Sequence, residues 1–263
     1  MDTRSEIDIT FDFRSDTPGY YTSNTDPDAL SPTLRRYHKC LWSKPLPSGD
    51  FFELVDTTPG VYLHHRSHLG EFRLTSDTVI PSFRKEARIA PFIAQEPDEL
   101  AKFNALGYTI GGMMLFPGNR IGNKMTINGS RGCHGKIKDR FDLTVECIRR
   151  HYRGDQSPLS DVLDRYADFF DLFGDFHGYV EFFLLQDLLT EDRNTVRFMA
   201  PFEDFRTSPL PASFEAYSTY RKRATEFIEA RNRRILHFAL GTAANTPQVG
   251  VVRRNDNETA EEQ

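Results

Sequence analysis

The hydrophobic pattern changes its period near Ile137, and this change constrains the fold more than any other feature of the sequence. Before that point, short segments alternate apolar and polar residues, which is typical of strands with one buried face. After it, apolar residues recur every three or four positions, which is typical of helices. The pattern predicts an α+β fold, in which a strand-rich, mostly antiparallel N-terminal half packs against a helical C-terminal half.

The clearest strand prediction is a β-hairpin in the middle of the chain. Residues 108–116 and 124–130 are its expected strands, and the Gly- and Asn-rich residues 117–123 are suited to a turn with positive φ angles. Further strands are expected at residues 7–13, at 51–65 with a turn at Pro59-Gly60, at 71–80 before Pro81, and at 196–202.

Helices are expected at residues 31–44, 96–107, 137–152, 159–173, 176–189 and 213–240. The first begins at Ser31-Pro32, because serine is a preferred N-cap and proline suits the first turn. The second ends near Gly107, a residue type common at helix C-termini. The last helix presents one face with a 3.6-residue spacing, formed by Tyr217, Tyr220, Ala224, Phe227, Ile228, Arg231, Ile235 and Phe238.

The chain is long enough, at 263 residues, to bury a full core, and its 22 Phe and 10 Tyr predict that aromatic rings dominate it. A clean linker between the two halves is missing from the sequence. Residues 1–240 are therefore expected to form a single domain, and the polar residues 241–263 a disordered tail.

Composition excludes several classes of protein. No run approaches the ~20 apolar residues of a membrane span, and the charged first residues do not fit a secretory signal, so a soluble cytoplasmic protein is expected. Three cysteines without CxxC spacing argue against a disulfide framework or a zinc ribbon. A net charge of -5 argues against general electrostatic binding to DNA.

The best candidate for a ligand site is a local concentration of positive charge. Residues 117–140 carry six Lys/Arg and one Asp, whereas residues 155–192 carry ten Asp/Glu and one Arg. Backbone N–H groups of glycines, a following helix N-terminus and basic side chains together suit a phosphate group. The alternative is a solvated hairpin whose arginines pair with the acidic segment. The candidate ligand-binding residues are Arg120, Lys124, Asn128, Arg131, His134 and Lys136.

His64 and His65 are the candidate catalytic residues, because imidazole exchanges protons near neutral pH and paired histidines can cleave RNA without a metal. Their alternative role is structural. A metal site would need a third ligand, and Glu71 is a poor one, so neither a metal nor a cofactor is expected. Ser76-Asp77 at a strand end can seat a nucleophile but is more typical of a turn.

Several long blocks resemble an uncharacterised bacterial family of unknown function. They are TIGGMMLFPGNRIGNKMTINGSRG, KDRFDLTVECIRRHYRG, SPLSDVLDRYADFFDLF, GYVEFFLLQDL and FIEARNRRI, and the likeness spans residues 10 to 240. This resemblance implies no activity or site residues. The late segment TYRKRATEFIEARNRRI is also similar in character to the endoribonuclease toxins of RNA-antitoxin systems, which implies an RNA substrate.

The expected function is binding of an anionic ligand, RNA or a nucleotide phosphate, at the basic hairpin. One alternative is a metal-independent endoribonuclease of a toxin or defence system, with His64 or His65 as the proton-transferring group. Another is a non-enzymatic module that binds a protein partner at the same place.

Overall fold

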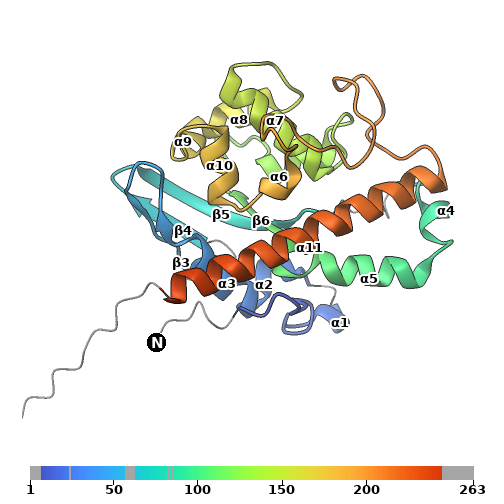
Figure 1. The fold of residues 1–263 in the computed structure, drawn as a ribbon, viewed down its shortest axis with the longest axis horizontal. Coiled ribbons are helices and arrows are strands. Elements are labelled where there is room, and N and C mark those ends of the chain that lie inside the picture. Colours follow the sequence, from blue (N-terminus) through green and yellow to red (C-terminus); the bar gives the residue numbers. More distant parts are fainter. Residues whose placement is uncertain (1–6, 24, 57–62, 82, 84–85, 245–263) are drawn as a thin grey trace, which may run out of the picture.

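The computed structural model describes residues 7–23, 25–56, 63–81, 83 and 86–244. An antiparallel sheet and several helices from the N-terminal half pack against a helical C-terminal half, as the α+β prediction required. The helices α6–α10 lie over one side of the sheet, and the long helix α11 crosses the whole molecule (Figure 1).

The N-terminal segment forms turns and three helices, α1 (Tyr20–Ser23), α2 (Pro27–Leu30) and α3 (Pro32–Trp42). The strand expected at residues 7–13 is wrong. Side chains there bond to their own backbone, since the Asp8 carboxylate accepts from the backbone N–H and the hydroxyl of Thr10. The helix start at Ser31 is confirmed, because the Ser31 hydroxyl accepts from the N–H of Leu34 at 3.1 Å.

The main sheet is an antiparallel meander in the order β3 (Val55–Asp56), β4 (Leu63–Ser67), β5 (Gly70–Thr78) and β6 (Met113–Pro117). A small second sheet pairs β1 (Lys44–Pro45) with β2 (Phe51–Phe52). The strand predicted at 71–80 is thus confirmed as β5, which pairs with β6 from Thr78–Met113 to Leu74–Pro117. The turn predicted at Pro59-Gly60 lies outside the described residues.

Between β5 and β6 the chain forms α4 (Ala90–Ile93), α5 (Pro97–Gly107) and the 3-10 helix η3 (Ile110–Gly112). The hairpin predicted for residues 108–130 is wrong in its second strand. Residues 127–133 form helix α6 (Ile127–Cys133) instead, because the hydroxyl of Thr126 caps it by accepting from the N–H of Gly129 at 3.3 Å. Only the first expected strand exists, as β6.

The C-terminal half contains α7 (Phe141–Arg153), α8 (Ser160–Leu163), η4 (Asp164–Tyr166), α9 (Ala167–Asp171), α10 (Phe176–Phe182) and η5 (Gln186–Leu188). As predicted, aromatic rings dominate the interior: the Phe173 ring lies 4.9–5.4 Å from those of Tyr179, Phe182 and Phe183. The strand expected at 196–202 is wrong, since Val196 forms only an isolated bridge with Leu189.

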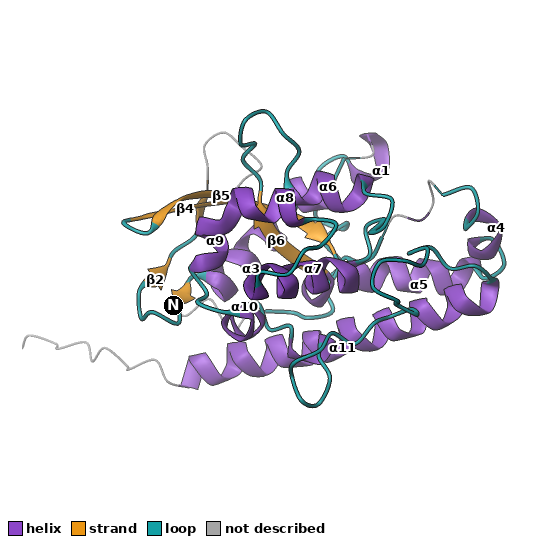
Figure 2. Cartoon of the chain, turned by 90° about the horizontal axis from the view of Figure 1, so that it is seen from above, coloured by secondary structure: helices purple, strands orange, loops and turns teal. Residues whose placement is uncertain are grey.

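Helix α11 (Phe214–Ala244) joins the parts of the fold, with α5 beside its N-terminal half in both views (Figures 1 and 2). Arg231, expected on its buried face, is fully buried and donates to the carbonyl oxygens of Phe183, Gly111 and Met113. Asn232 accepts from the N–H of Gly111 at 2.7 Å. Helix α11 continues past Gly241, where the disordered tail was expected to begin, to Ala244. The expected tail after Ala244 lies outside the described residues.

Candidate functional site

Two of the predicted ligand-binding residues, Lys124 and His134, lie on one surface groove. The groove separates the loop before α6 and the C-terminal end of α6 from α8, and its volume is about 610 Å³. We call it the α6–α8 groove. It is lined by Lys124, Met125, Ser130, Cys133, His134, Gly135, Pro158, Leu159, Asp161, Val162 and Arg165.

The groove also contains Arg165 of η4, which was not predicted from the sequence. Its guanidinium adds a second positive charge to that of Lys124. Its Nη1 donates to the carbonyl oxygen of Asp161 at 2.6 Å and its Nη2 to that of Met125 at 2.8 Å. Among the residues that the structure describes, neither Arg165 nor Lys124 forms an ion pair. Both therefore contribute positive charge at the groove, which also carries the carboxylate of Asp161.

His134 follows α6 as its C-terminal capping residue and is partly buried. Its Nδ1 accepts from the backbone N–H of Lys136 at 3.2 Å, which leaves Nε2 as the nitrogen that carries the proton in the neutral ring. A neutral His134 can thus donate through Nε2.

The other predicted residues do not line this groove. Arg120 and Lys136 are exposed on loops, and Asn128 lies within α6 with a buried Oδ1 that has no hydrogen-bond partner among the described residues. An amide oxygen without a donor is a poor neighbour for an anion, because it would repel negative charge.

Arg131 is fully buried, and its placement as an exposed ligand-binding residue needs correction. Its Nη1 lies 2.6 Å from Oδ2 of Asp77 and 3.0 Å from Oδ1 of Asp139. Its Nε donates to the hydroxyl of Thr144 at 3.3 Å and its Nη2 to the carbonyl oxygen of Asp139 at 3.0 Å. Two carboxylates of the protein thus already neutralise this guanidinium, and neither belongs to the acidic segment 155–192.

The carboxyl groups around Arg131 have unusual proton affinities. Burial raises the pKa of Asp77 to about 6, because the loss of hydration outweighs the nearby positive charge of Arg131. Burial, and then the charge of Asp77, raises the pKa of Asp28 in α2 well above its ordinary value. Carboxyl groups with raised pKa values are common at functional sites, and they also occur in buried ion-pair networks such as this one. No pattern in the sequence marks Asp28, which lies in a turn-rich segment.

The predicted catalytic histidines lie side by side on β4 and face opposite ways. The two nitrogens of His65 are 2.9 Å from the carbonyl oxygen of Glu53 and 2.9 Å from the Ser67 hydroxyl. The His64 Nε2 lies 3.0 Å from Oε1 of Glu71. Both ring nitrogens of His65 therefore form hydrogen bonds within the protein. For His64, the hydrogen bond to a described residue involves Nε2 and not Nδ1. Their catalytic role stays a prediction.

Ser76, which the sequence marked together with Asp77 as a possible nucleophile position, forms a buried pair with His38. His38 Nε2 lies 3.0 Å from the Ser76 hydroxyl, and its Nδ1 accepts from the indole N–H of Trp42 at 3.0 Å. Because an indole only donates, the proton of neutral His38 must sit on Nε2. His38 then donates to Ser76 and cannot deprotonate it. Burial also lowers the pKa of His38 to about 3.

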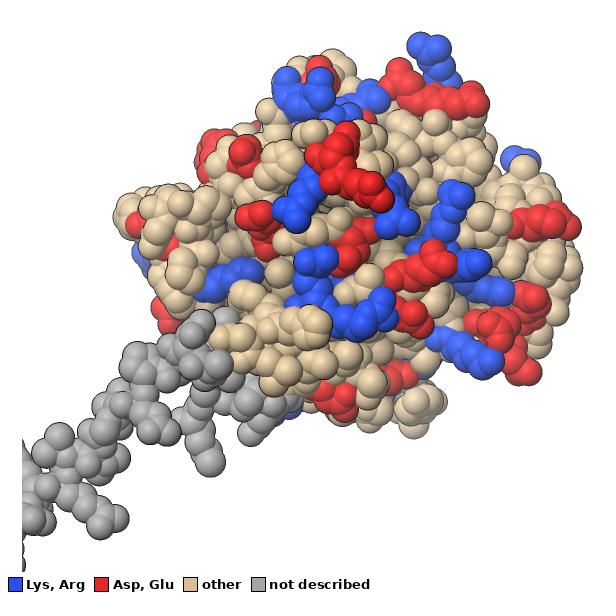
Figure 3. All heavy atoms as spheres, viewed as in Figure 1, with Lys and Arg blue, Asp and Glu red and all other residues tan. Residues whose placement is uncertain are grey.

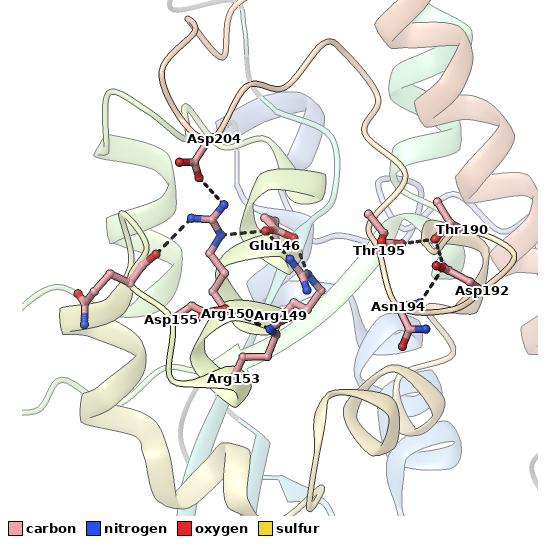
Figure 4. A network of polar contacts seen from close by, with 11 residues as sticks. Glu146, Arg149, Arg150, Arg153, Asp155, Thr190, Asp192, Asn194, Thr195 and Asp204 are labelled. Carbon is pink, nitrogen blue, oxygen red and sulfur yellow. Dashed lines mark hydrogen bonds and ion pairs between the residues drawn. The ribbon is translucent and has the colours of Figure 1, made fainter.

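Many other arginines are neutralised within the fold. Figure 4 shows the buried Glu146 of α7 between Arg149 and Arg150, with their Nε atoms at 2.8 and 2.9 Å from its two oxygens. Arg150 also reaches Asp204 at 2.5 Å, in the loop between η5 and α11. On the face drawn in Figure 3, positive and negative groups of the described chain alternate without a broad area of one sign. A general polyanion surface is therefore not visible on this face.

The fold and the groove define an α+β protein with a local, partly cationic surface groove. The chain belongs to the family of unknown function DUF6994, which matches residues 7–235. No curated protein and no solved structure matches the chain, so the likeness to endoribonuclease toxins has no support from these comparisons. None of the described helices is both long and apolar enough to cross a membrane.

Proposed function

We propose that the protein binds a phosphorylated ligand, a nucleotide or the end of an RNA, in the α6–α8 groove. The observation that supports this most directly is the presence of Lys124 and Arg165, two cationic side chains without ion-pair partners among the described residues, on one groove. This proposal retains Lys124 and His134 from the sequence and replaces Arg131 by Arg165.

The rest of the groove suits the remainder of such a ligand. Met125, Pro158, Leu159 and Val162 provide an apolar wall, against which a base or another planar group can pack. The hydroxyl of Ser130 and Nε2 of His134 can donate to phosphate oxygens, and Asp161 can accept from an amino or ribose hydroxyl group. A nucleotide offers all three kinds of group.

Binding can be measured through Cys133, which is exposed and lines the groove. A bound nucleotide should slow its reaction with a thiol reagent, and the concentration dependence gives the dissociation constant. A panel of ATP, GTP, the corresponding monophosphates, free nucleosides and short RNAs at two salt concentrations tests the preference for phosphate, because contacts with phosphate weaken as salt rises.

The matched variants are Lys124→Ala and Lys222→Ala, since Lys222 is an equally exposed lysine on α11. Loss of one charge-assisted contact, worth roughly 1.5 kcal/mol, should weaken binding about tenfold for Lys124→Ala and leave Lys222→Ala unchanged. If no phosphorylated compound protects Cys133 in the unmodified protein, or if nucleosides protect it as well as nucleotides do, the proposal is wrong.

The endoribonuclease and the protein-binding module stay predictions, and no contact described above favours either of them. Incubation of the protein with total RNA, in parallel with the variants His64→Ala and His65→Ala, addresses the nuclease. A nuclease that depends on these residues would lose cleavage in one of the two variants while retaining RNA binding.

A further inference from the structure

A second pocket lies between helix α11 and the chain that runs from Asp187 in η5 to Met199, and its volume is about 330 Å³. We call it the η5–α11 pocket. It shares no lining residue with the α6–α8 groove. Its α11 wall is formed by Arg223, Glu226 and Ala230, since residues three and four positions apart lie on the same side of a helix. The volume is near the lower end for ligand sites and therefore suits a small molecule.

The opposite wall is carried by a tight hairpin of residues 188–197. The backbone N–H of Arg197 donates to the carbonyl oxygen of Leu188 at 2.8 Å. At the turn of the hairpin, Oδ1 of Asp192 accepts from the hydroxyl of Thr190 at 2.5 Å (Figure 4). These bonds fix the backbone of Arg197, whose side chain lines the pocket.

Two arginines on different walls of the pocket have no carboxylate partner among the described residues. Arg197 is exposed, and its side chain forms no hydrogen bond or ion pair with any of them. Arg223 donates through Nη1 to the carbonyl oxygen of Phe198 at 3.2 Å, a contact that leaves its charge unpaired. Because a guanidinium group presents several donors in one plane, the two arginines can hold one ligand carboxylate from two sides.

The two carboxylates that line the pocket differ in their availability. Asp187 is held by Arg234, whose Nε lies 2.7 Å from Oδ2 and whose Nη2 lies 2.8 Å from Oδ1. Glu226 is exposed, and within the described part of the chain its side chain has no partner. Glu226 can therefore accept from a cationic group of a ligand, whereas both oxygens of Asp187 are already engaged.

The rest of the pocket is largely apolar. Leu188, Met199 and Phe227 line it and are buried, and the small side chain of Ala230 leaves space beside them. Apolar walls with a few charged groups are typical of sites that bind small molecules. This pocket thus offers two cations, one free carboxylate and an apolar surface.

We propose that the η5–α11 pocket binds a free α-amino acid with an apolar side chain. The ligand carboxylate lies between the guanidinium groups of Arg197 and Arg223, and its ammonium group donates to Glu226. Its side chain packs against the buried apolar residues. A simple carboxylic acid leaves Glu226 without a partner, and a simple amine leaves both arginines without one. An amino acid carries both groups on one carbon atom. This site is separate from the proposed nucleotide site.

Isothermal titration calorimetry of the full chain with L-leucine, L-methionine and L-phenylalanine tests the proposal. The controls are the corresponding amides, which lack the carboxylate, and the corresponding deamino acids, which lack the ammonium group. At least one amino acid should bind, about tenfold or more tightly than its amide and its deamino acid, because each control loses a charge-assisted contact. If none of the three binds at millimolar concentration, or if either control binds as tightly as its amino acid, the proposal is overturned.

Variants at exposed positions then locate the site. Arg197→Gln and Glu226→Gln should each weaken binding of the preferred amino acid about tenfold. The matched controls are Arg233→Gln and Glu229→Gln, which are exposed on α11 outside this pocket and should leave the affinity unchanged. Equal affinities within either matched pair overturn the proposal. Nucleotide protection of Cys133 is measured at the α6–α8 groove, so either proposal can fail while the other holds.

Discussion

Nη1 of Arg131 lies 2.6 Å from Oδ2 of Asp77, and the two residues are 54 positions apart in the sequence. The guanidinium is fully buried, and it also contacts Asp139 and the rings of Phe116 and Phe141. Arg131 therefore fixes the end of β5 against α6 and the segment that leads into α7. Its role is to organise the interior. A count of charges along the sequence does not reveal burial, and for this reason it predicted that Arg131 binds a ligand.

Replacement of Arg131 by methionine should lower the free energy of unfolding by about 3–5 kcal/mol, because it removes the guanidinium that pairs with the carboxylate of Asp77 inside the protein. Urea denaturation followed by circular dichroism measures the change. Arg120→Met, at an exposed position, should change stability by no more than about 0.5 kcal/mol. Equal effects of the two substitutions would contradict the assignment of Arg131 to the interior.

Gly112 and Gly132 should respond oppositely to alanine. A Cβ atom at Gly112 would lie 2.2 Å from the carbonyl oxygen of Gly107, a contact that requires the backbone to move, so a loss of about 1–3 kcal/mol is expected. Gly132 lies in α6 with nothing within 4 Å of such an atom, and alanine there should stabilise the helix by about 0.5–1 kcal/mol. Chemical denaturation of the two variants provides the comparison.

His38 should make the protein less stable in acid. Its pKa is lowered to about 3, so between pH 6.5 and pH 3 the unfolded chain takes up a proton that the folded chain does not. Stability should therefore fall by up to about 1.4 kcal/mol per pH unit as the pH decreases through this window. His38→Gln should reduce the slope of unfolding free energy against pH, measured from pH 7.5 to pH 5.

Asp77 acts in the opposite direction, because its raised pKa lets the folded chain bind a proton first, between pH 6 and pH 3.8. Asp77 is present in both His38→Gln and the unmodified protein, so its contribution cancels when the two slopes of unfolding free energy against pH are subtracted. His177→Gln, at an exposed position of α10, serves as the control. A slope that does not change in His38→Gln relative to this control would show that His38 is not held neutral.

The three cysteines should differ widely in reactivity towards a thiol reagent. Cys133 is exposed and should react first, whereas Cys147 is fully buried and its pKa is raised to about 12 by the loss of hydration. Cys147 should react only after unfolding. Mass spectrometry of the modified peptides, with and without urea, identifies each site. Modification of Cys147 as fast as Cys133 in the folded protein would contradict this order.

The sequence predicted local structure best at positions where a single cap or a regular helical spacing determines it. Ser31 caps a helix because its own hydroxyl reaches the N–H three residues later, and the spacing of Arg231 among aromatic and aliphatic residues placed it on the buried face of α11. The prediction of the second hairpin strand was wrong. Residues 124–130 alternate like a strand, but the cap at Thr126 and the burial of Ile127 favour a helix.

The candidate sites were harder to predict, because their members come together only in three dimensions. The local positive charge indicated Lys124 and His134, which line the α6–α8 groove, whereas Arg165 lies in an acidic segment where its charge does not stand out. Asp28 lies in a region that resembles a loop, and burial beside Asp77 of β5 raises its pKa. Sequence patterns describe neighbours along the chain and carry little information about such contacts.

The contacts of α11 also have a consequence during synthesis. The ribosome produces residues 109–113 and 183 long before Arg231 and Asn232, which are their partners. Nascent chains that stop short of this helix hold unpaired carbonyl groups and apolar surface that the finished protein covers. We expect such intermediates to engage chaperones, and native structure to form only once the helix has left the exit tunnel.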